Sequence, residues 1–204
     1  MPQPSHISAL GVPDPGTLDD DLKAIWAKCV EKLGFVPAVY STYSKRPQRL
    51  RNFMAMYNEI MYAPSGLSKL EREMVAVVVS SANRCYYCLV AHGAAVRQLS
   101  GDPELGEMMA LNYRVAKLDG RQRAMLDFAW KLTTTPNLVD DADRDGLRGH
   151  GMAEEDIFDL AETTAFFNLS NRMASATDMM PNPEYHRADR RAPFVPPAAK
   201  PRKG

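Results

Sequence analysis

The chain has 204 residues, 45% of them hydrophobic, which is enough to form one sizeable core. Lys and Arg total 25 and Asp and Glu also total 25, so no excess of basic residues favours nucleic acid as a partner. Residues Met1–Gly16 contain four prolines and no apolar stretch of signal-peptide length. The longest apolar run, Met74–Val79, is too short to span a bilayer. We therefore expect a cytoplasmic protein of one domain, with neither nucleic acid nor a membrane as partner.

Apolar residues recur at helical spacing along most of the chain, and no segment alternates with period two for long enough to indicate a sheet. The pattern predicts an all-α fold. We expect helices, in chain order, at about residues 22–33, 50–61, 69–79, 85–99, 104–111, 121–132, 140–148 and 154–177. Asn168, Asn171 and Arg172 are expected to interrupt the last of these, and they are given no catalytic role.

The two ends of the chain differ in composition from the part between them. Residues 1–16 predict an extended N-terminal arm, and residues 17–180 predict a single helical domain. Residues 181–204 are rich in proline and basic residues and show no apolar period, which predicts a C-terminal arm that is extended or partly disordered.

A weak internal repeat is visible in two helix starts. Leu67–Met74 and Leu118–Met125 share their Leu, Arg and Met positions, but the second copy has Ala124 where the first has Glu73. We consider a degenerate helical repeat and a chance match about equally consistent with this pattern.

The residues that carry chemistry gather in one short segment. Cys85, Cys88 and His92 are offset by three and seven positions, so on one helix they would lie along a single stripe, and Glu73 precedes them in an apolar helical segment. A thiol near a helix N-terminus is stabilised as the thiolate. A thiolate that attacks a peroxide becomes a sulfenic acid, and a second thiol can condense with it to a disulfide. His92 can act as the base, with Glu73 orienting it.

Two other interpretations of this cluster stay open at this point. Cys85, Cys88, His92 and Glu73 are also an acceptable set of zinc ligands, and the two cysteines could simply be small buried residues. A c-type haem is excluded because Leu89, rather than a histidine, follows the second cysteine.

The remaining cysteine and histidines have simpler explanations. Cys29 shares its helical stripe with apolar residues and is interpreted as a packing residue. The other three histidines, His6, His150 and His186, are expected to be solvated rather than to bind a ligand.

The spacing of these residues resembles that of a known group of proteins. Glu73, eleven intervening residues, and then Cys85-x-x-Cys88-x-x-x-His92 reproduce the pattern of the alkyl hydroperoxidase D-like (AhpD-like), carboxymuconolactone decarboxylase-like superfamily, in particular its peroxidase-related proteins. Ser80–Arg84, Gly34–Pro37 and Phe166–Arg172 are also similar to that group. The resemblance implies an AhpD-like all-α bundle and assembly into a dimer, trimer or hexamer. It also implies reduction of hydroperoxides without haem, flavin or metal, and a protein or small-thiol electron donor.

The resemblance further implies an order for the two thiols. In alkyl hydroperoxidase D the second cysteine attacks, so Cys88 would attack the peroxide and Cys85 would resolve the sulfenic acid. Helix-dipole reasoning alone favours Cys85 instead. We follow the resemblance, because His92 stands one turn beyond Cys88 and can act as its base, with Glu73 behind it. Tyr87 replaces the histidine that precedes the second cysteine in alkyl hydroperoxidase D, so the substrate and electron donor are left open.

The sequence therefore predicts a thiol-dependent hydroperoxide reductase that cycles through a Cys85–Cys88 disulfide. The alternatives are a non-enzymatic helical module that binds zinc or senses redox state, and a general disulfide reductase that does not act on peroxide.

Overall fold

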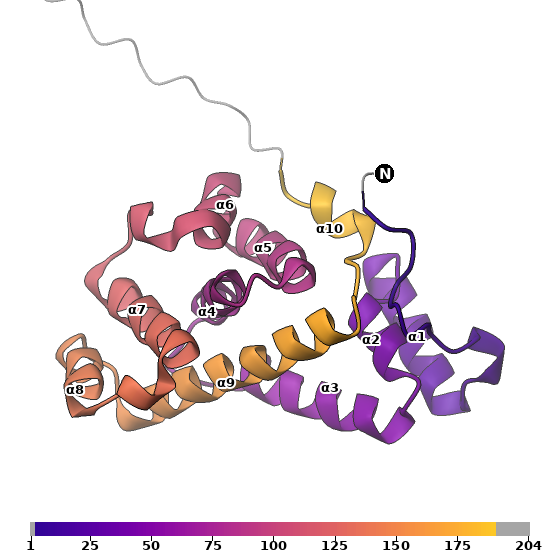
Figure 1. The fold of residues 1–204 in the computed structure, drawn as a ribbon, viewed down its shortest axis with the longest axis horizontal. Helices are drawn as coiled ribbons and strands as arrows, with labels where there is room; N and C mark the ends of the chain where they lie inside the picture. Colours follow the sequence, from indigo (N-terminus) through magenta and orange to yellow (C-terminus); the bar gives the residue numbers. More distant parts are fainter. Residues whose placement is uncertain (1–2, 191–204) are drawn as a thin grey trace, which may run out of the picture.

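The computed structural model of the protein describes residues 3–190, and this part of the chain contains helices and no strand (Figure 1). The predicted all-α fold is thus confirmed. The α-helices are α1 (Asp20–Leu33), α2 (Ala38–Tyr43), α3 (Pro47–Tyr62), α4 (Lys69–Ala82), α5 (Tyr86–Ser100), α6 (Pro103–Asn112), α7 (Gly120–Thr134), α8 (Asp141–Gly149), α9 (Glu154–Ala176) and α10 (Pro183–Arg187). Short 3-10 helices cover Pro15–Thr17, Tyr113–Val115 and Pro136–Leu138. None of the described helices is long and apolar enough to cross a membrane.

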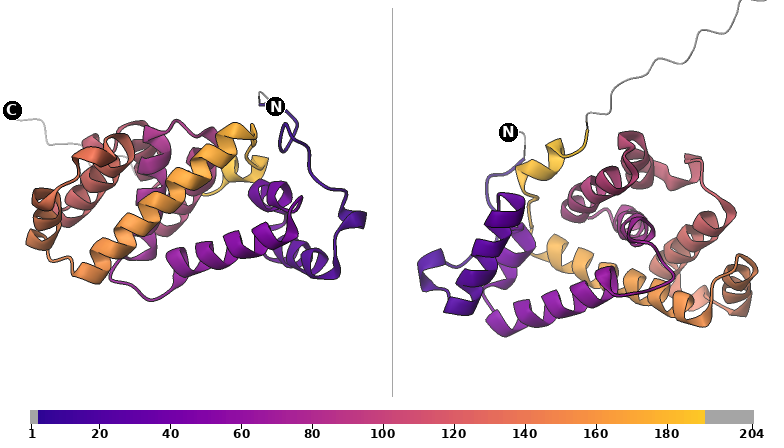
Figure 2. Two further views of the ribbon diagram at one scale, coloured as in Figure 1. Left: turned by 60° about the horizontal axis from the view of Figure 1, so that its bottom comes forward. Right: turned by 180° about the vertical axis from the view of Figure 1, so that it is seen from behind.

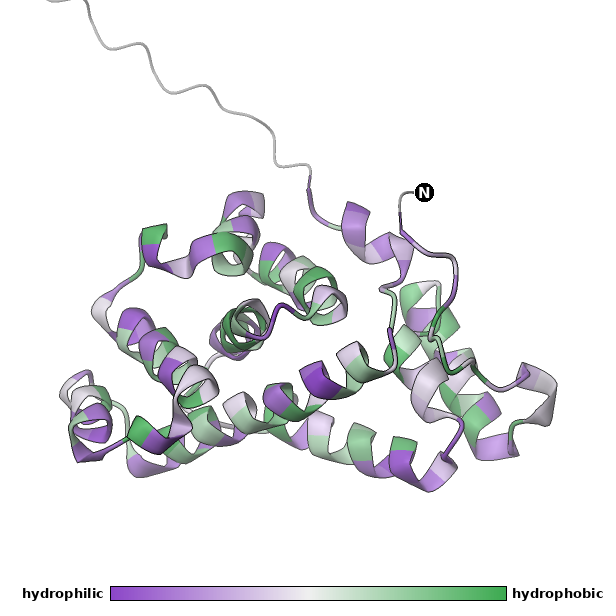
Figure 3. Cartoon of the chain, viewed as in Figure 1, coloured by the Kyte–Doolittle hydropathy of each residue, from purple (hydrophilic) through white to green (hydrophobic). Residues whose placement is uncertain are grey.

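Helix α4 lies at the centre of the bundle, and α5, α6, α7 and α9 pack around it (Figure 1). Every residue from Glu71 to Ser80 is buried, including the run of valines that makes this helix largely hydrophobic (Figure 3). Valine is a weak helix former, so burial of this segment, rather than intrinsic propensity, stabilises the helix. Ser68 begins it with a capping box, in which its hydroxyl accepts from the Glu71 N–H and the Glu71 carboxylate accepts from the Ser68 N–H.

Helices α1 to α3 form a second layer beside this bundle, and α3 lies against α9 (Figure 2). A small cluster of buried apolar side chains, Leu18, Leu22 and Leu50, joins α1 to α3. The segment between α1 and α2 brings Leu33 and Tyr40 toward α5 and α9, where they line the cavity described below. This layer therefore completes one side of the functional site.

Several predicted boundaries are correct within a few residues, and three features differ. Helix α2 was not predicted, because six residues following Pro37 are too few to show a helical period. Asn168, Asn171 and Arg172 do not interrupt α9, which continues to Ala176.

The segment after Pro181 is not wholly extended, because Pro183–Arg187 form α10. The backbone carbonyls of Tyr185 and Ala188 accept hydrogen bonds of 2.8 and 2.9 Å from the buried Arg97 guanidinium, which holds α10 against α5. The rest of the predicted C-terminal arm, residues 191–204, lies outside the described residues.

The N-terminal arm runs beside the end of α9. The Ala9 N–H donates to the Thr177 carbonyl, and the Met180 N–H donates to the Ile7 carbonyl, at 2.9 and 3.0 Å. The side chain of Gln3 donates to the carbonyl of Pro181. Both ends of the described chain thus lie close to the start of α5.

The two segments of the weak internal repeat begin α4 and α7, which pack against each other. Asp119 forms a capping box with Gln122, as Ser68 does with Glu71. The similarity ends after these helices, because a 3-10 helix at Pro136–Leu138 takes the place that α5 has in the first copy. Only the first copy carries the cysteines.

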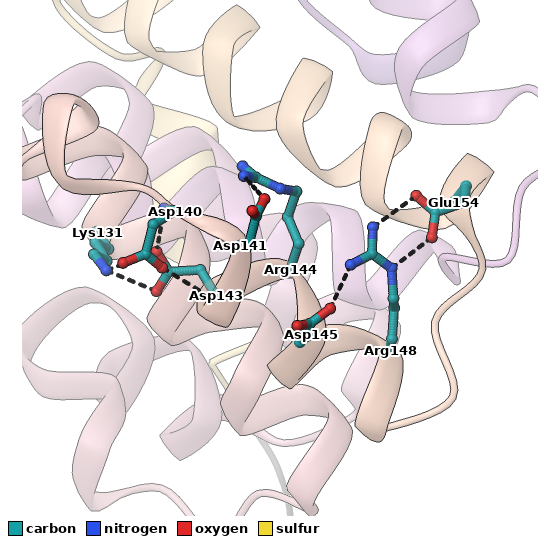
Figure 4. A network of polar contacts seen from close by, with 8 residues as sticks. All are labelled: Lys131, Asp140, Asp141, Asp143, Arg144, Asp145, Arg148 and Glu154. Atoms are coloured by element: carbon teal, nitrogen blue, oxygen red, sulfur yellow. Dashed lines mark hydrogen bonds and ion pairs between the residues drawn. The ribbon is translucent and has the colours of Figure 1, made fainter.

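Helix α8 is the charged surface helix that the sequence predicts. Its acidic and basic side chains pair with one another and with Lys131 and Glu154 (Figure 4). The Lys131 Nζ and Asp143 Oδ2 atoms are 2.6 Å apart, and Arg148 bridges Asp145 and Glu154. Exposed pairs of this kind contribute less than about 1 kcal/mol each to stability. This network therefore stabilises the fold only weakly, and it positions no part of the functional site.

Candidate active site

The turn between α4 and α5 places the first cysteine at the start of a helix. Asn83 ends α4, and Arg84 has a φ of 52°, in the left-handed region that non-glycine residues seldom adopt. This conformation reverses the chain in one residue, so that Cys85 is extended and becomes the N-cap of α5. The Cys85 N–H donates to the Ser80 carbonyl at 2.9 Å, which fixes the turn against the end of α4. Cys85 thus precedes the helix that Cys88 and His92 occupy.

Both cysteines of the pair are buried free thiols. Cys85 is 1% exposed and Cys88 is fully buried, and they pack in a small cluster with Ala38, Ala174 and Met179. Cys29, interpreted as a packing residue, lies apart in α1 and is partly buried. The two thiols of the motif therefore meet in a sheltered site, where a sulfenic acid formed on one is protected from solvent.

Glu73 and His92 form a close pair across α4 and α5. The His92 Nδ1 atom and the Glu73 Oε2 atom are 2.7 Å apart, and the Glu73 side chain is only 7% exposed. An ionised carboxylate only accepts, so Nδ1 carries the donated proton and Nε2 is left to accept one. The edge of the His92 ring packs against Phe167, with ring centroids 4.6 Å apart. The structure thus brings together the base and the acidic residue that the sequence predicts.

The surroundings of Cys85 stabilise its thiolate. The Cys88 thiol is the main cause and lowers the pKa of Cys85 to about 7, against the opposing effect of burial. The Cys88 backbone N–H, the Ser175 hydroxyl and His92 lower this pKa further. These are the effects expected at a helix N-cap, where backbone N–H groups and the helix dipole favour negative charge.

Cys88 has the opposite behaviour. The neighbouring Cys85 and burial raise the pKa of Cys88 well above its ordinary value, although Asn171 and Ser170 partly oppose this. Near neutral pH a large fraction of the pairs therefore carries one negative charge, which lies on Cys85, while Cys88 keeps its proton. The helix-dipole argument, which favours Cys85 as the thiolate, thus agrees with the state of the two thiols before any reaction. The order of attack, with Cys88 first, remains a prediction and requires Cys88 to lose this proton before it reacts.

A cavity of about 250 Å³ lies beside the Glu73–His92 pair. Residues of α1 to α5, α9 and α10 line it, and aromatic side chains predominate: Tyr40, Phe53, Tyr57, Tyr62, Tyr87, Phe166, Phe167 and Tyr185. Ser170 also lines it, and the same Ser170 hydroxyl interacts with the Cys88 thiol. This main cavity therefore borders the Glu73–His92 pair and, through Ser170, comes close to the Cys88 thiol.

A second cavity, of about 240 Å³, lies on the side of Cys85. Cys85 itself lines it, together with the more polar residues Arg84, Ser175 and Asp178 and two methionines. Among the lining residues, only Tyr87 is common to both cavities. Cys85 thus borders the second cavity, whereas the fully buried Cys88 lines neither of these two cavities.

Comparisons with known proteins show which family this chain resembles. The family model described as the carboxymuconolactone decarboxylase family matches residues 47–129, which include Glu73, both cysteines and His92. A peroxidase-related protein from Silicibacter sp. TM1040 is 56% identical to this chain, and the match covers 93% of this chain and 100% of that one, with a TM-score of 0.89. This chain belongs to the carboxymuconolactone decarboxylase family.

Two further solved structures are also similar to this chain. A peroxidase-related protein from Ralstonia eutropha JMP134, described as an alkylhydroperoxidase AhpD core, is 44% identical, with 92% of this chain and 98% of that one covered and a TM-score of 0.88. The debrominase Bmp8 shares the fold at 19% identity and a TM-score of 0.74, over 91% of this chain and 96% of its own. The curated proteins gave no match. This chain thus shares the AhpD-like all-α fold with these structures.

Helix α9 supplies site residues that sequence reasoning missed in this family member. Ser170, Asn171 and Ser175 interact with the two thiols and modulate their pKa values. The Asn171 amide also donates to the Ser80 hydroxyl at 2.9 Å, and its oxygen accepts from Asn83 at 3.0 Å. Their spacing on α9, one turn apart and facing the buried cysteine helix, is the only signal that could have indicated them. Asn171 therefore holds the α4–α5 turn, whereas the sequence interpretation gave it no defined role.

Tyr87 is buried in the same cluster as the two thiols and links two helices. Its hydroxyl accepts a hydrogen bond of 3.2 Å from the Val39 N–H, and burial raises its pKa well above the ordinary value. Tyr87 therefore links α5 to α2 and remains a neutral phenol at the site.

The remaining histidines lie outside the catalytic pair. The exposed His6 pairs with Asp178, and the partly buried His186 contacts Gln3 and Tyr86. Within residues 3–190, no group of three or more His, Cys, Asp and Glu side chains is arranged to hold a metal ion. The zinc alternative therefore has no assembled set of ligands in this part of the chain.

Proposed function

We propose that this protein is a thiol-dependent peroxidase that reduces organic hydroperoxides through a Cys85–Cys88 disulfide. The main support is the 2.7 Å Glu73–His92 pair beside two buried free thiols, one of which has a pKa lowered to about 7. Membership of a family with AhpD-like peroxidase-related proteins agrees with this function. The donor of electrons is a dithiol or two monothiols, on a protein or a small molecule.

The first half of the reaction oxidises Cys88. His92 Nε2 takes the Cys88 proton, and the thiolate sulfur attacks the terminal peroxide oxygen. The O–O bond breaks, Cys88 becomes a sulfenic acid, and the leaving alkoxide takes the proton back from His92 as an alcohol. Glu73 stabilises the charged imidazole while it holds this proton.

The second half closes the disulfide. The Cys85 thiolate attacks the Cys88 sulfur, the S–O bond breaks, and the hydroxide that leaves takes a proton to become water. One hydroperoxide and two thiols thus give one alcohol, one water and one disulfide. Two donor thiols then reduce the disulfide by exchange. The lowered pKa of Cys85 suits this role, because a large fraction of the attacking sulfur in the resolving step is already deprotonated near neutral pH.

Thiol titration before and after one equivalent of cumene hydroperoxide tests this proposal. We expect wild type to lose two of its three thiols, and Cys29→Ser to lose both of those that remain. The Cys85→Ser/Cys88→Ser double variant is the matched control and should consume no peroxide. Unchanged thiols in wild type would contradict the peroxidase function.

A general disulfide reductase is the second candidate, and the lowered pKa of Cys85 favours it. An N-cap thiolate near pKa 7 is also suited to thiol–disulfide exchange. Reduction of a model disulfide by the reduced protein, with no reaction toward hydroperoxides, would select this function instead.

A further inference from the structure

The main cavity carries a chemical signature beyond its place beside the cysteine pair. Five of its lining side chains are tyrosines, Tyr40, Tyr57, Tyr62, Tyr87 and Tyr185, and they come from four different helices. Burial raises the pKa of Tyr40 to about 12 and raises the pKa values of Tyr57 and Tyr185 as well. Tyr40, Tyr57 and Tyr185 are therefore neutral phenols at physiological pH, and they offer hydroxyl groups on a largely apolar wall.

The charges around this cavity disfavour an anionic ligand. Among its lining residues in the described part of the chain, none is a lysine or an arginine, and the one carboxylate is Glu73. His92 is the one lining side chain that can become a cation, and its Nδ1 atom already faces Glu73. A bound carboxylate would therefore lie near a negative charge without a cation of its own, which is costly in a buried site.

The volume of the cavity also limits what it can hold. At about 250 Å³ it is smaller than pockets that hold drug-sized ligands, which span about 300–1,000 Å³. A single substituted ring or a short branched chain fits such a volume, whereas a long acyl chain does not. Phe53, Phe166 and Phe167 supply apolar and ring-stacking surface for that group.

We propose that the main cavity selects uncharged, ring-sized organic hydroperoxides and rejects anionic ones such as fatty-acid hydroperoxides. The inference rests on the proposed function and narrows its substrate class. The ring of the substrate packs against the phenylalanines, and its peroxide oxygens accept hydrogen bonds from the tyrosine hydroxyls beside His92.

Matched substrates test the charge preference directly. We expect wild type to react with cumene hydroperoxide and with the methyl ester of its para-carboxylic acid derivative at similar rates. The corresponding para-carboxylate, which carries a negative charge in place of the methyl group, should react at least about 10-fold more slowly, equivalent to about 1.4 kcal/mol. Equal rates for the ester and the carboxylate would overturn the inference.

The converse test introduces a positive charge at the rim of the main cavity. Leu33 lines the cavity and is 51% exposed, and Val30 lies one turn earlier on the same helix, is 52% exposed and lines no part of it. Leu33→Lys should increase the rate for the carboxylate relative to the ester, by about fivefold, because it supplies the missing cation. Val30→Lys, the matched control, should leave this ratio unchanged. The same increase in both variants would contradict selection by the cavity.

A binding measurement separates this inference from the peroxidase function. The unreactive alcohol 2-phenyl-2-propanol and its para-carboxylate can be titrated into the wild-type protein by calorimetry. We expect the neutral alcohol to bind the more tightly even if no hydroperoxide is consumed, in which case the peroxidase proposal alone would fail. Tighter binding of the carboxylate would overturn the inference whatever the peroxidase result.

Discussion

The two sides of the cysteine pair differ in shape and chemistry. On the side of Cys88, the main cavity is aromatic, contains the Glu73–His92 pair and has no lining cation apart from this histidine among the described residues. On the side of Cys85, the second cavity has a similar volume and is lined by the polar residues Arg84, Ser175 and Asp178. Under the proposed function, the two sides have different roles: the substrate binds and protons are transferred beside His92, and the negative charge is held on Cys85.

Removal of the base should have the largest effect on this division. In His92→Ala, Cys88 has no base to take its proton, and the leaving alkoxide has no acid. We expect the rate of peroxide consumption to fall by about 100- to 10,000-fold, measured by stopped-flow kinetics. Glu73→Gln should produce a smaller loss, since the imidazole keeps a hydrogen-bonding partner. His150→Ala, at the exposed end of α8, is the control. A full rate in His92→Ala would remove the proposed proton relay.

The charge stored on Cys85 depends on its neighbour. Cys88→Ala removes the main cause of the lowered pKa of Cys85, so this pKa should rise toward its ordinary value of about 9. The rate of Cys85 alkylation by iodoacetamide at pH 7 should then fall by about 10-fold. Ser175→Ala removes a weaker contribution and should give a smaller decrease. An unchanged alkylation rate in Cys88→Ala would show that the helix N-terminus alone stabilises this thiolate.

The pH dependence of Cys85 alkylation should report the lowered pKa of Cys85. Because the lowered pKa of Cys85 is about 7, the thiolate fraction of the pair rises as the pH increases through this value. We expect the alkylation rate of Cys85 in Cys29→Ser to increase up to about tenfold per pH unit below 7 and to level off above it. A midpoint near 9 would contradict a stabilised thiolate at this position.

The wall formed by α10 should have the smallest effect on chemistry. Arg97→Leu loses the two hydrogen bonds to the carbonyls of Tyr185 and Ala188, so α10 should loosen and Tyr185 should leave the main cavity. We expect a loss of about 1–3 kcal/mol in the free energy of unfolding, measured with urea, and a rise of a few-fold in KM with little change in kcat. The exposed Arg187→Leu on α10 is the control. An unchanged KM in Arg97→Leu would show that α10 does not shape the cavity.

The sequence was sufficient for the parts of the fold and site that depend on local patterns. Apolar periodicity predicted most helices, and the spacing of Glu73, Cys85, Cys88 and His92 predicted the close pair across α4 and α5. These residues are close in the chain, and consecutive antiparallel helices bring them together. A short helix such as α2 was missed, since six residues cannot show a period.

Long-range features could not be predicted from the same patterns. Ser170 and Asn171 are more than eighty residues from the cysteines in the chain, and no local signal links them to the thiols. The lowered pKa of Cys85 likewise depends in part on Ser175 of α9, a contact that appears only when α9 packs against α5, and burial opposes this effect. The left-handed conformation of Arg84 has no sequence signal either, because glycine or asparagine would be the usual residue there.

The order of the two thiols is the central claim, and trapping of the first sulfenic acid tests it most directly. Cys85→Ser and Cys88→Ser, each with Cys29→Ser, are treated with one equivalent of cumene hydroperoxide and dimedone and then analysed by mass spectrometry. We predict a dimedone adduct on Cys88 in Cys85→Ser after a single turnover, and no adduct on Cys85 in Cys88→Ser. An adduct on Cys85 in Cys88→Ser, with Cys88 unmodified in Cys85→Ser, would contradict the account and assign the attack to the thiol that holds the charge at rest.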